Sequence, residues 1–364
     1  MYEVYCPQTY RLNKEYPLYI GKRVLDELPK KIAPFKPNKV LLITDSNLSK
    51  LYSSKILSLL NQFETHLVEI PAGEENKNFQ NYLDLCNKII DLGATKSTFL
   101  VIMGGGMVGN LAGFAASTVM RGLNFAHIPT NIMAQVDSTT GGKQAINLSQ
   151  GKNLLGVFND PKFILIDIDF LKTLPKREIS CGLAECIKHA ICQDENFVDK
   201  LYGLLDQGSK YSEEDYLFII KNTIDLKIKL LRMDPKEINE GKILVYGHTI
   251  GHAVETLSKG KLNHGESISI GMVAAARASV MFNIADNSLL EQHIDLLQKA
   301  GLPTKIIPEI TYENIINQLK YDKKISSTMD LILLEKVGVV HHIEGRIGYP
   351  VDKEQLKEII LQCY

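Results

Sequence analysis

Residues 97–117 read STFLVIMGGGMVGNLAGFAAS, and this stretch decides the fold class. An apolar run typical of a buried strand enters three glycines, and small residues typical of a helix start follow. Glycines at such a turn let the backbone approach a ligand closely, and the first N–H groups of the helix can bind a phosphate. A tight strand-to-helix turn without a ligand would use the same glycines. The spacing is not the GxGxxG of a standard dinucleotide fold, so the stretch alone leaves both interpretations open.

Strand and helix patterns alternate around this stretch. Apolar strands are predicted at 39–45, 65–73, 124–130 and 162–170, and helices at 50–62 and 81–94. Strands that are apolar throughout and alternate with helices predict a parallel α/β sheet. After about residue 177 long helical patterns dominate, with a capping candidate at Ser180 and a hairpin pattern at 331–346. We therefore expect an α/β domain over residues 1–177 and a mainly α-helical domain over residues 178–364.

The composition is that of an ordinary globular protein of 364 residues, with 45% hydrophobic and 23% charged residues and a net charge of −1. The pI of about 6.8 gives no support for a nucleic-acid or membrane-surface partner. Six cysteines without a CxxC spacing suggest free thiols in a reducing cytoplasm. The sequence shows no signal peptide pattern and no apolar run of about 18 residues. We expect a cytoplasmic protein with no membrane or nucleic-acid partner.

A polar segment at residues 120–153 is expected to form a long loop. Its cationic and amide side chains suit the recognition of phosphates and polyols, and they include Arg121, Asp137, Lys143, Lys152 and Asn153. A solvated loop is the ordinary interpretation of such a segment. Ordered loops of this length inside a compact domain are often functional, so we favour a binding role.

A third pattern is GHTIGHAVETLSKGKLNHGE at residues 247–266. His248 and His252 are four residues apart, which places both rings on one face of a helix, and His264 follows a predicted turn. Glu185 lies on another predicted helix, with Lys188 one turn further along. A single helical histidine is usually a core or surface residue. One carboxylate with two or three imidazoles, however, is typical of a catalytic zinc site that keeps an open position.

These patterns occur together with further short strings, in one order, over residues 102–266. They are MGGG-x-x-G-x-x-AGFAAS, MRG, PT-x-x-x-AQVDS-x-x-GGK, GKN, LKTLP-x-RE, GLAE-x-IK, GHTIGHA and HGE. Together they resemble the 3-dehydroquinate synthase family, the sugar phosphate cyclases. The resemblance implies an NAD-binding α/β domain with a parallel sheet, followed by a mainly α-helical metal-binding domain, and assembly into a homodimer.

The resemblance also implies a chemistry. Members bind NAD⁺ and a divalent metal, usually zinc or cobalt, and convert a sugar phosphate into a carbocycle. A ring hydroxyl is transiently oxidised, phosphate is eliminated, the ketone is reduced again, and the opened ring closes by an aldol step. The phosphate itself can serve as the base, so a dedicated protein base is not required.

Residue by residue, the resemblance assigns the metal to Glu185, His248 and His264, whereas the residues alone left a three-histidine site open. It assigns substrate phosphate contacts to Arg121, Lys143, Asn153, His252 and Lys324. It assigns the sugar hydroxyls or ring orientation to Asp137, Lys152, Lys188 and Lys227. The positions that match NAD⁺ contacts are Asp45, Glu74, Lys77, Gly105, Gly106, Thr130 and Thr173, and Lys152 is counted with them. The expected catalytic residues are Lys188, Asp137, His252 and Lys143.

The sequence departs from 3-dehydroquinate synthases where they bind the substrate carboxylate. The arginine seven residues before the first metal histidine is Gly241 here, and the asparagine three before it is Val245. Arginine suits a carboxylate because of its two-pronged geometry, and a buried carboxylate without a partner costs roughly 3–5 kcal/mol. Asn110 and Gln144 replace the usual aspartate and threonine. These departures resemble 2-deoxy-scyllo-inosose synthases, which cyclise glucose 6-phosphate.

Other features keep alternatives open. 2-Deoxy-scyllo-inosose synthases usually have glutamate at the position of Val245 and lack the glycines of GGK at 141–143. A 3-dehydroquinate synthase therefore remains the second interpretation, and a cyclase of another sugar phosphate without a carboxylate the third. A metal-dependent polyol dehydrogenase would share the architecture but release NADH, and the phosphate-binding set argues against it. The complete metal set and Lys188 argue against a protein that has lost catalysis.

Overall fold

The computed structural model describes residues 1–9, 14–205, 210–322 and 329–364. The chain divides into two compact units, Met1–Leu174 and Pro175–Tyr364. Lys324, an expected phosphate contact, lies outside the described residues.

The first unit is built on a seven-stranded sheet in the order β1-β2-β9-β6-β5-β3-β4. Its strands are β1 (Tyr2–Pro7), β2 (Glu15–Gly21), β3 (Val40–Asp45), β4 (Thr65–Ile70), β5 (Phe99–Gly104), β6 (Asn124–Pro129) and β9 (Ile164–Asp167). β1 is antiparallel to β2, and all other neighbours pair in parallel. Every residue of β3 and β5 is buried, as expected for central strands covered on both faces. The predicted parallel α/β sheet is confirmed.

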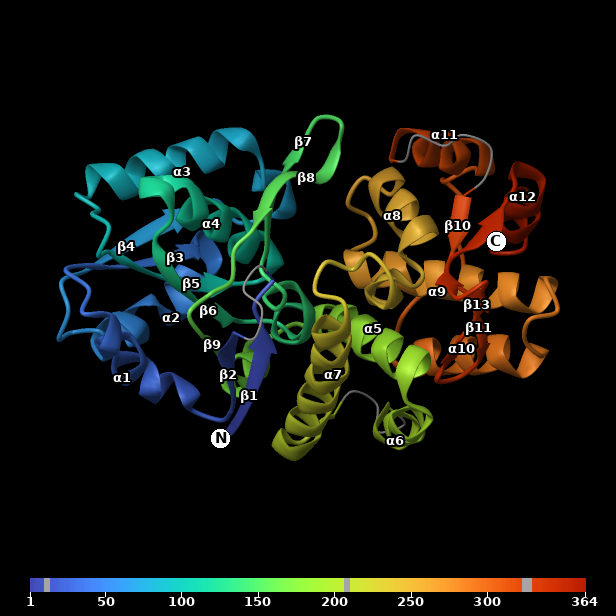
Figure 1. Cartoon of the computed structure of the whole chain (residues 1–364), viewed down its shortest axis with the longest axis horizontal. Coiled ribbons are helices and arrows are strands. Elements are labelled where there is room, and N and C mark those ends of the chain that lie inside the picture. The colour runs from blue at the N-terminus through green and yellow to red at the C-terminus, as the bar shows by residue number, and fades with distance from the viewer. Residues whose placement is uncertain (10–13, 206–209, 323–328) are drawn as a thin grey trace. The chain divides into compact units, whose positions relative to one another are not determined.

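Helices cover the two faces of this sheet (Figure 1). α3 (Phe79–Asp91) and α4 (Gly106–Thr118) pack on the face that carries Leu41, Ile102 and Phe125. α1 (Leu28–Ile32) and α2 (Ser46–Leu59) pack on the face that carries Leu42 and Val101. Successive residues of each strand thus point to opposite cores, which explains why the strands are apolar throughout. Two short 3₁₀ turns, η1 (Val24–Glu27) and η2 (Ala33–Phe35), flank α1.

The remaining elements of the first unit are short. The 3₁₀ turns are η3 (Glu74–Asn76), η4 (Val119–Arg121) and η6 (Ile168–Thr173), and η5 (Ala134–Ser138) is a π-helical turn. β7 (Lys143–Leu148) and β8 (Gly151–Phe158) form an antiparallel hairpin that packs against α4. Because β3, β5 and β6 are parallel, the residues that follow them meet at one edge of the sheet, which we call the carboxyl edge.

The second unit is mainly helical. Its helices are α5 (Lys176–Gln193), α6 (Glu195–Leu205), α7 (Glu213–Met233), α8 (His248–Leu257), α9 (His264–Met281), α10 (Asn287–Lys299), α11 (Tyr312–Asp322) and α12 (Lys353–Leu361), with the 3₁₀ turn η7 (Glu240–Val245) before α8. α9 packs against α5, α8, α10 and α12, and most of its residues are buried. It is the central helix of this unit (Figure 1).

Three small strand pairs complete the second unit. β10 (Met329–Leu331) pairs with β15 (Tyr349–Val351), β11 (Leu334–Lys336) with β12 (Val339–Val340), and β13 (His342–Ile343) with β14 (Arg346–Ile347). The single hairpin predicted at 331–346 is therefore two hairpins in succession.

Three local predictions were wrong. Residues 120–153 are not one loop but contain η4, β6, η5 and the start of the β7–β8 hairpin, because runs of buried residues in β6 and β7 interrupt the polar side chains. Ser180 does not cap a helix, since α5 already begins at Lys176 after Pro175. The strand predicted at 162–170 ends at Asp167, whose side chain accepts the N–H of Asp169 and starts a 3₁₀ turn.

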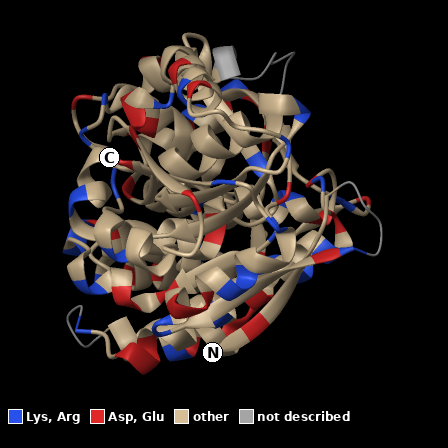
Figure 2. Ribbon diagram, turned by 90° about the vertical axis from the view of Figure 1, so that its left-hand side faces the viewer, with Lys and Arg blue, Asp and Glu red and all other residues tan. Residues whose placement is uncertain are grey.

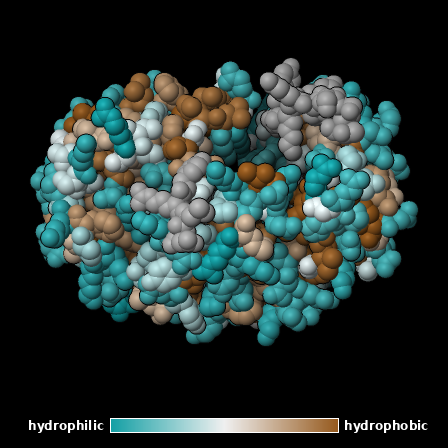
Figure 3. Space-filling view, viewed as in Figure 1, coloured by the Kyte–Doolittle hydropathy of each residue, from teal (hydrophilic) through white to brown (hydrophobic). Residues whose placement is uncertain are grey.

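Charged residues of both signs are interspersed over the ribbon in Figure 2, which fits the net charge of −1. Hydrophilic residues cover most of the face seen in Figure 3, with apolar residues over α3. Among the exposed apolar side chains are Phe79, Leu83 and Ile90 of α3 and Leu154 and Val157 of β8. In the described part of the chain no helix has both the length and the apolar character needed to cross a membrane.

Candidate active site

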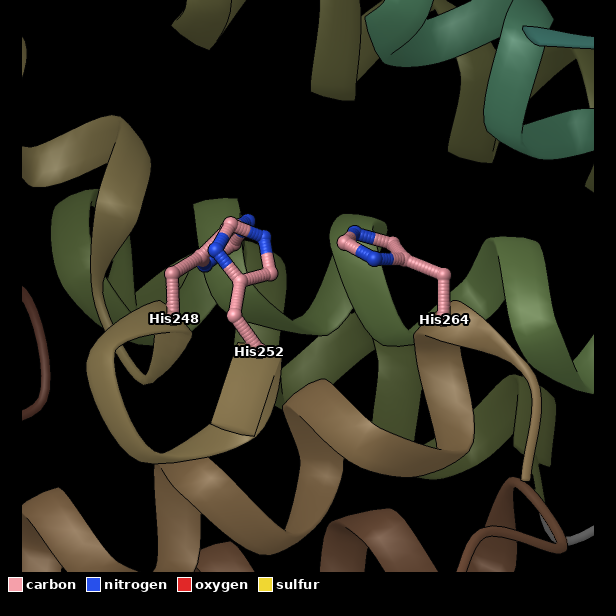
Figure 4. Close-up of side chains that lie close together, drawn as sticks. All are labelled: His248, His252 and His264. Atoms are coloured by element: carbon pink, nitrogen blue, oxygen red, sulfur yellow. The ribbon is translucent and has the colours of Figure 1, made fainter. Parts of the chain in front are cut away.

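Three histidines of the second unit point toward a common space (Figure 4). His248 is the first residue of α8 and His252 lies one turn later, while His264 is the first residue of α9. The ring centroids are 5.0 Å apart for His248 and His252, 5.5 Å for His248 and His264, and 5.7 Å for His252 and His264. Gly247 precedes α8 with φ 75°, where a Cβ would lie 2.7 Å from the backbone nitrogen of Met272. A glycine is therefore required where the chain enters this cluster.

Glu185 of α5 lies beside His248 and His264, and its side chain is fully buried. Its Oε1 lies 3.5 Å from Nε2 of His248 and 3.5 Å from Nε2 of His264. Zinc bonds of about 2.0–2.2 Å in a tetrahedron place neighbouring ligand atoms about 3.3 Å apart. Glu185, His248 and His264 therefore fit a tetrahedral divalent metal that keeps a fourth position open.

The other ring nitrogen of each of these histidines is anchored. His248 Nδ1 donates to the carbonyl of Tyr246 at 2.9 Å, and His264 Nδ1 donates to Glu255 Oε2 at 3.1 Å. In the neutral ring, a proton held on Nδ1 leaves Nε2 as the lone-pair nitrogen on the side of Glu185. Such partners are the usual way in which proteins fix the tautomer and the direction of a metal-binding histidine.

The buried ionisable groups of this cluster shift one another's pKa values. Burial would raise the pKa of Glu185, but the charge of Lys188 and the hydrogen bond with His264 hold it well below its usual range. Burial and the nearby Lys188 lower the pKa of His248 well below its usual value. Burial would also lower the pKa of His264, but the hydrogen bonds with Glu185 and Glu255 raise it to about 9. Without a metal, His264 and Lys188 thus supply the positive charge beside Glu185.

Two expected substrate residues lie on the helices of this unit. Lys188 is buried, contacts Glu185 Oε2 and donates to the carbonyl of Leu244 at 2.5 Å. Lys227 is buried on α7, a helix that packs against α5. The second unit therefore brings together Glu185, Lys188 and the three histidines.

In the first unit the glycine turn lies at the carboxyl edge of the sheet. A Cβ on Gly104 would lie 2.5 Å from Cβ of Val108, one on Gly105 2.8 Å from Asn131 Nδ2, and one on Gly106 3.0 Å from Ser138 Oγ. Crowding at a tight turn thus accounts for these glycines without a ligand.

The same turn nevertheless fits an anionic cofactor. No side chain caps α4 at Gly105, so the first N–H groups of the helix are not used by a cap. The buried hydroxyl oxygen of Ser138, which lies beside Gly106, has no hydrogen-bond partner among the described residues. Free helix N–H groups and a hydroxyl donor suit the pyrophosphate of NAD⁺.

Lys77 forms a second centre in this unit. Its side chain is buried and donates to Asn110 Oδ1 at 2.7 Å and to Asn153 Oδ1 at 2.5 Å. Glu74 Oε1 is 4.0 Å from the same nitrogen and accepts from Asn147 Nδ2 at 3.0 Å. The structure therefore brings Glu74 and Lys77, which were expected at the cofactor, into one network with Asn153, which was expected at the phosphate.

The other expected cofactor residues also lie at the carboxyl edge. Asp45 Oδ1 caps α2 by accepting from the backbone N–H groups of Asn47 and Leu48. The N–H of Thr130 donates to the carbonyl of Gly104 at 3.1 Å, which ties the ends of β5 and β6 together. Thr173 lies in η6, and its hydroxyl is 2.5 Å from the Tyr52 hydroxyl. This edge is where parallel α/β sheets bind their ligands.

The polar residues of 120–153 are spread over several elements. Asp137 lies in the π-helical turn η5, a kind of turn that is frequent at functional sites. Lys143 begins β7, Lys152 and Asn153 lie in β8, and their side chains are exposed. Arg121 lies beyond the far end of α4, whereas the carbonyl of Lys143 accepts from Asn110 near the start of that helix. Arg121 is therefore not gathered with Lys143 and Asn153.

The sequence patterns missed several residues that shape these centres. Glu255 and Tyr246 anchor the histidines, yet no periodicity distinguishes them from ordinary helix and loop residues. The hydroxyls of Tyr52 and Thr173 are neighbours only because the fold brings these two distant parts of the sequence together. The capping box of Asn263 and Glu266 was readable as an N-x-x-E pattern before an apolar helix. It bears on the site only because the residue that follows Asn263 is His264.

Comparison with known proteins identifies relatives of the whole chain. Residues 67–181 match the family model "3-dehydroquinate synthase N-terminal", and residues 182–325 match "3-dehydroquinate synthase C-terminal". The 3-dehydroquinate synthase of Ruminiclostridium cellulolyticum is 36% identical over 353 residues, which are 96% of each chain. That of Thermoanaerobacter pseudethanolicus is 39% identical over 336 residues, 90% of this chain and 93% of the relative.

Solved structures show the same architecture. A 2-deoxy-scyllo-inosose synthase complexed with carbaglucose-6-phosphate, NAD⁺ and Co²⁺ aligns with a TM-score of 0.92 at 29% identity, over 100% of both chains. The 2-epi-5-epi-valiolone synthase ValA from Streptomyces hygroscopicus, with NAD⁺ and Zn²⁺ bound, aligns with a TM-score of 0.83 at 22% identity, over 97% of this chain and 98% of ValA. The latter likeness extends to the fold alone.

Proposed function

The chain belongs to the 3-dehydroquinate synthase family of sugar phosphate cyclases, and from that premise we propose that it cyclises a hexose phosphate without a carboxylate, with glucose 6-phosphate as the lead substrate. The reaction is that of a 2-deoxy-scyllo-inosose synthase. The family's enzymes eliminate phosphate and form a carbocycle. The full-length similarity to a 2-deoxy-scyllo-inosose synthase that binds a carba-analogue of glucose 6-phosphate supports the proposal.

The observation that carries the proposal is the loop around Gly241. Asp234 Oδ2 accepts the backbone N–H groups of Asn239 at 2.6 Å and Gly241 at 3.0 Å. A Cβ on Gly241 would lie 3.0 Å from both the carbonyl and Oδ2 of Asp234 and 3.1 Å from Cβ of Glu237. A side chain at the position where relatives with a carboxylated substrate use arginine would therefore crowd this loop, and its neighbours would have to shift by a few tenths of an ångström. A substrate without a carboxylate needs no arginine there.

A 3-dehydroquinate synthase, acting on 3-deoxy-arabino-heptulosonate 7-phosphate, is the alternative. The names of curated relatives with 36–39% identity favour it. The glycines of GGK also favour it: Gly141 and Gly142 have φ of 97° and 67°, so the turn before Lys143 depends on them. Gln144 does not separate the alternatives directly, because it is buried against Gly113 of α4 and not on the exposed side of β7.

We propose that NAD⁺ and a divalent metal, zinc or cobalt, are the cofactors, with Glu185, His248 and His264 as the metal ligands. When bound, the two cofactors supply the transient oxidation and re-reduction of a ring hydroxyl. Lys188 keeps Glu185 ionised and, as a buried cation, can donate to a sugar oxygen. The Asp137 carboxylate can accept from a sugar hydroxyl. Lys143, Asn153 and His252 provide donors for the phosphate that leaves.

We also propose that the enzyme is a homodimer in the cytoplasm. The exposed apolar side chains of α3 and β8 offer a surface of the kind that protein contacts cover. Arg121, separated from Lys143 and Asn153 by the length of α4, could join a phosphate site through a second copy. The six cysteines are free, which suits a reducing compartment.

A substrate panel tests the proposal. The purified enzyme, loaded with metal and NAD⁺, is given glucose 6-phosphate or 3-deoxy-arabino-heptulosonate 7-phosphate, and released phosphate and NADH absorbance are followed. We expect phosphate from glucose 6-phosphate without net NADH. Turnover of the heptulosonate alone would establish the alternative, and NADH accumulation would indicate a dehydrogenase.

A further inference from the structure

Two sequence strings, P-x-RE at 175–178 and HGE at 264–266, meet in the second unit through Arg177 and Glu266, to which no role has been assigned. Arg177, in the first turn of α5, donates from Nε to Glu266 Oε1 at 2.7 Å and from Nη2 to Glu266 Oε2 at 2.6 Å. The same Nη2 donates to the carbonyl of Lys261 at 2.6 Å. The Arg177 guanidinium therefore binds the chain on both sides of His264, at Lys261 three residues before it and at Glu266 two residues after it.

Glu266 also forms hydrogen bonds at the start of α9. Its Oε2 accepts the N–H of Asn263 at 2.8 Å, while Asn263 Oδ1 accepts the N–H of Glu266 at 2.9 Å. This reciprocal pair is a capping box, and it fixes the backbone of the helix start. His264 lies inside the box, so its Cα position is set by the same contacts.

The start of α9 is also pressed against α5. The N–H of Gly265 donates to Cys181 Sγ at 3.3 Å, and a Cβ on Gly265 would lie 2.1 Å from the carbonyl oxygen of Cys181. Glu185 lies one helical turn after Cys181. The distance between Glu185 and His264 is therefore governed by how α9 packs on α5, and the ion pair between Arg177 and Glu266 joins the two helices at that end.

We propose that Arg177 and Glu266 are positioning residues for the metal centre: their two-pronged ion pair holds His264 at the separation from Glu185 that a metal requires. An exposed ion pair alone contributes little, and more than half of the Arg177 side chain is exposed. Its forked geometry and its third bond to the Lys261 carbonyl make this pair a geometric constraint. The proposal rests on the metal ligands named under the proposed function.

The test compares metal binding in matched variants. Arg177→Lys keeps the positive charge but loses the two-pronged geometry of the guanidinium. Glu266→Gln loses the ion pair but keeps the capping box, because glutamine is as suitable as glutamate at that position. Glu309→Gln is the control, since it removes the exposed pair that Lys261 forms with Glu309 at 2.8 Å and leaves the Lys261 carbonyl in place. His264→Ala reports whether His264 is a metal ligand.

Zinc affinity is measured by chelator competition, cobalt geometry by visible absorption, and folding by the melting temperature of the metal-free proteins. We expect about 10–100-fold weaker zinc binding and an altered cobalt spectrum for Arg177→Lys and Glu266→Gln, with Glu309→Gln unchanged. Zinc affinity within twofold of the unaltered protein in both variants would overturn the proposal, whatever happens to the melting temperature. Full metal retention by His264→Ala would instead overturn the ligand assignment itself, independently of the substrate.

Discussion

The candidate sites of the two units are built from different chemical groups. The carboxyl edge of the first unit presents backbone N–H groups at a crowded glycine turn and the amide oxygens of Asn110 and Asn153 around Lys77. The second unit gathers the ionisable side chains of Glu185, Lys188, His248 and His264 in a buried cluster.

This difference matters because the two kinds of site respond to change differently. The backbone donors of the glycine turn carry no removable charge, so that turn depends on packing. Buried charges are stable only when they are balanced, so the second site depends on each partner and on the metal. The predictions below test this contrast, beginning with the largest expected effect.

Removing a metal ligand gives the largest effect. We expect His264→Ala to lose its metal almost completely, because a donor 3.5 Å from Glu185 Oε1 disappears. His252→Ala should keep its metal and lose substrate turnover instead. Metal analysis of both purified variants after dialysis measures this. Equal metal loss in the two variants would favour the three-histidine site that the clustering in Figure 4 also allows.

Removing the buried carboxylate comes second. Glu185→Gln leaves the buried Lys188 without its anionic partner, which should destabilise the metal-free protein by about 3–5 kcal/mol. Glu309→Gln, which breaks an exposed pair, should change stability by about 0–1 kcal/mol. Denaturant unfolding of both metal-free variants gives the comparison. Similar small losses would mean that the cluster does not depend on its charge balance.

The fold was more predictable than the sites. The parallel sheet followed from strands such as 39–45 and 97–106, because an apolar run with helices on either side has few other arrangements. The pairing of His248 with His252 followed from helical spacing. The anchors Glu255 and Tyr246 were not predictable, since their roles arise from tertiary contacts that leave no period in the sequence.

The segment 120–153 shows why polar density misleads. In β7 the polar Gln144 is buried together with Ala145 and Ile146, whereas the polar Lys143 is exposed. The amino-acid composition of this segment suits a loop as well as a hairpin. Only packing against α4 distinguishes them, and the π-helical turn that holds Asp137 has no known sequence signal in this chain.

The pH dependence of stability should differ between the units. In the metal-free protein the pKa of His264 is raised to about 9, so its contribution is complete below about pH 6.5 and is lost as the pH rises through 9. The loss amounts to at most roughly 3 kcal/mol. In the first unit burial lowers the pKa of His127 to about 3, so stability falls on the acid side, below about pH 6.5.

Hydrogen exchange at pH 6.5 and pH 9 tests the alkaline effect of His264 element by element. Protection of α9 in the metal-free protein should fall on the alkaline side, and His264→Gln should abolish that change. Metal-loaded protein should lack it too, because the bound metal replaces the proton. An unchanged alkaline limb in His264→Gln would assign the effect to another group.

The smallest effect concerns the glycine turn. Gly104→Ala places a methyl group 2.5 Å from Cβ of Val108, which cannot rotate away, so we expect a loss of about 1–3 kcal/mol in unfolding free energy. Gly105→Ala meets the end of the Asn131 side chain at 2.8 Å, which can shift, so its cost should be below about 1 kcal/mol. Neither should alter zinc affinity, because the ligands lie in the other unit. Denaturant unfolding and chelator competition measure the two quantities, and a loss of zinc affinity in Gly104→Ala would show that the packing of the first unit controls the charges of the second.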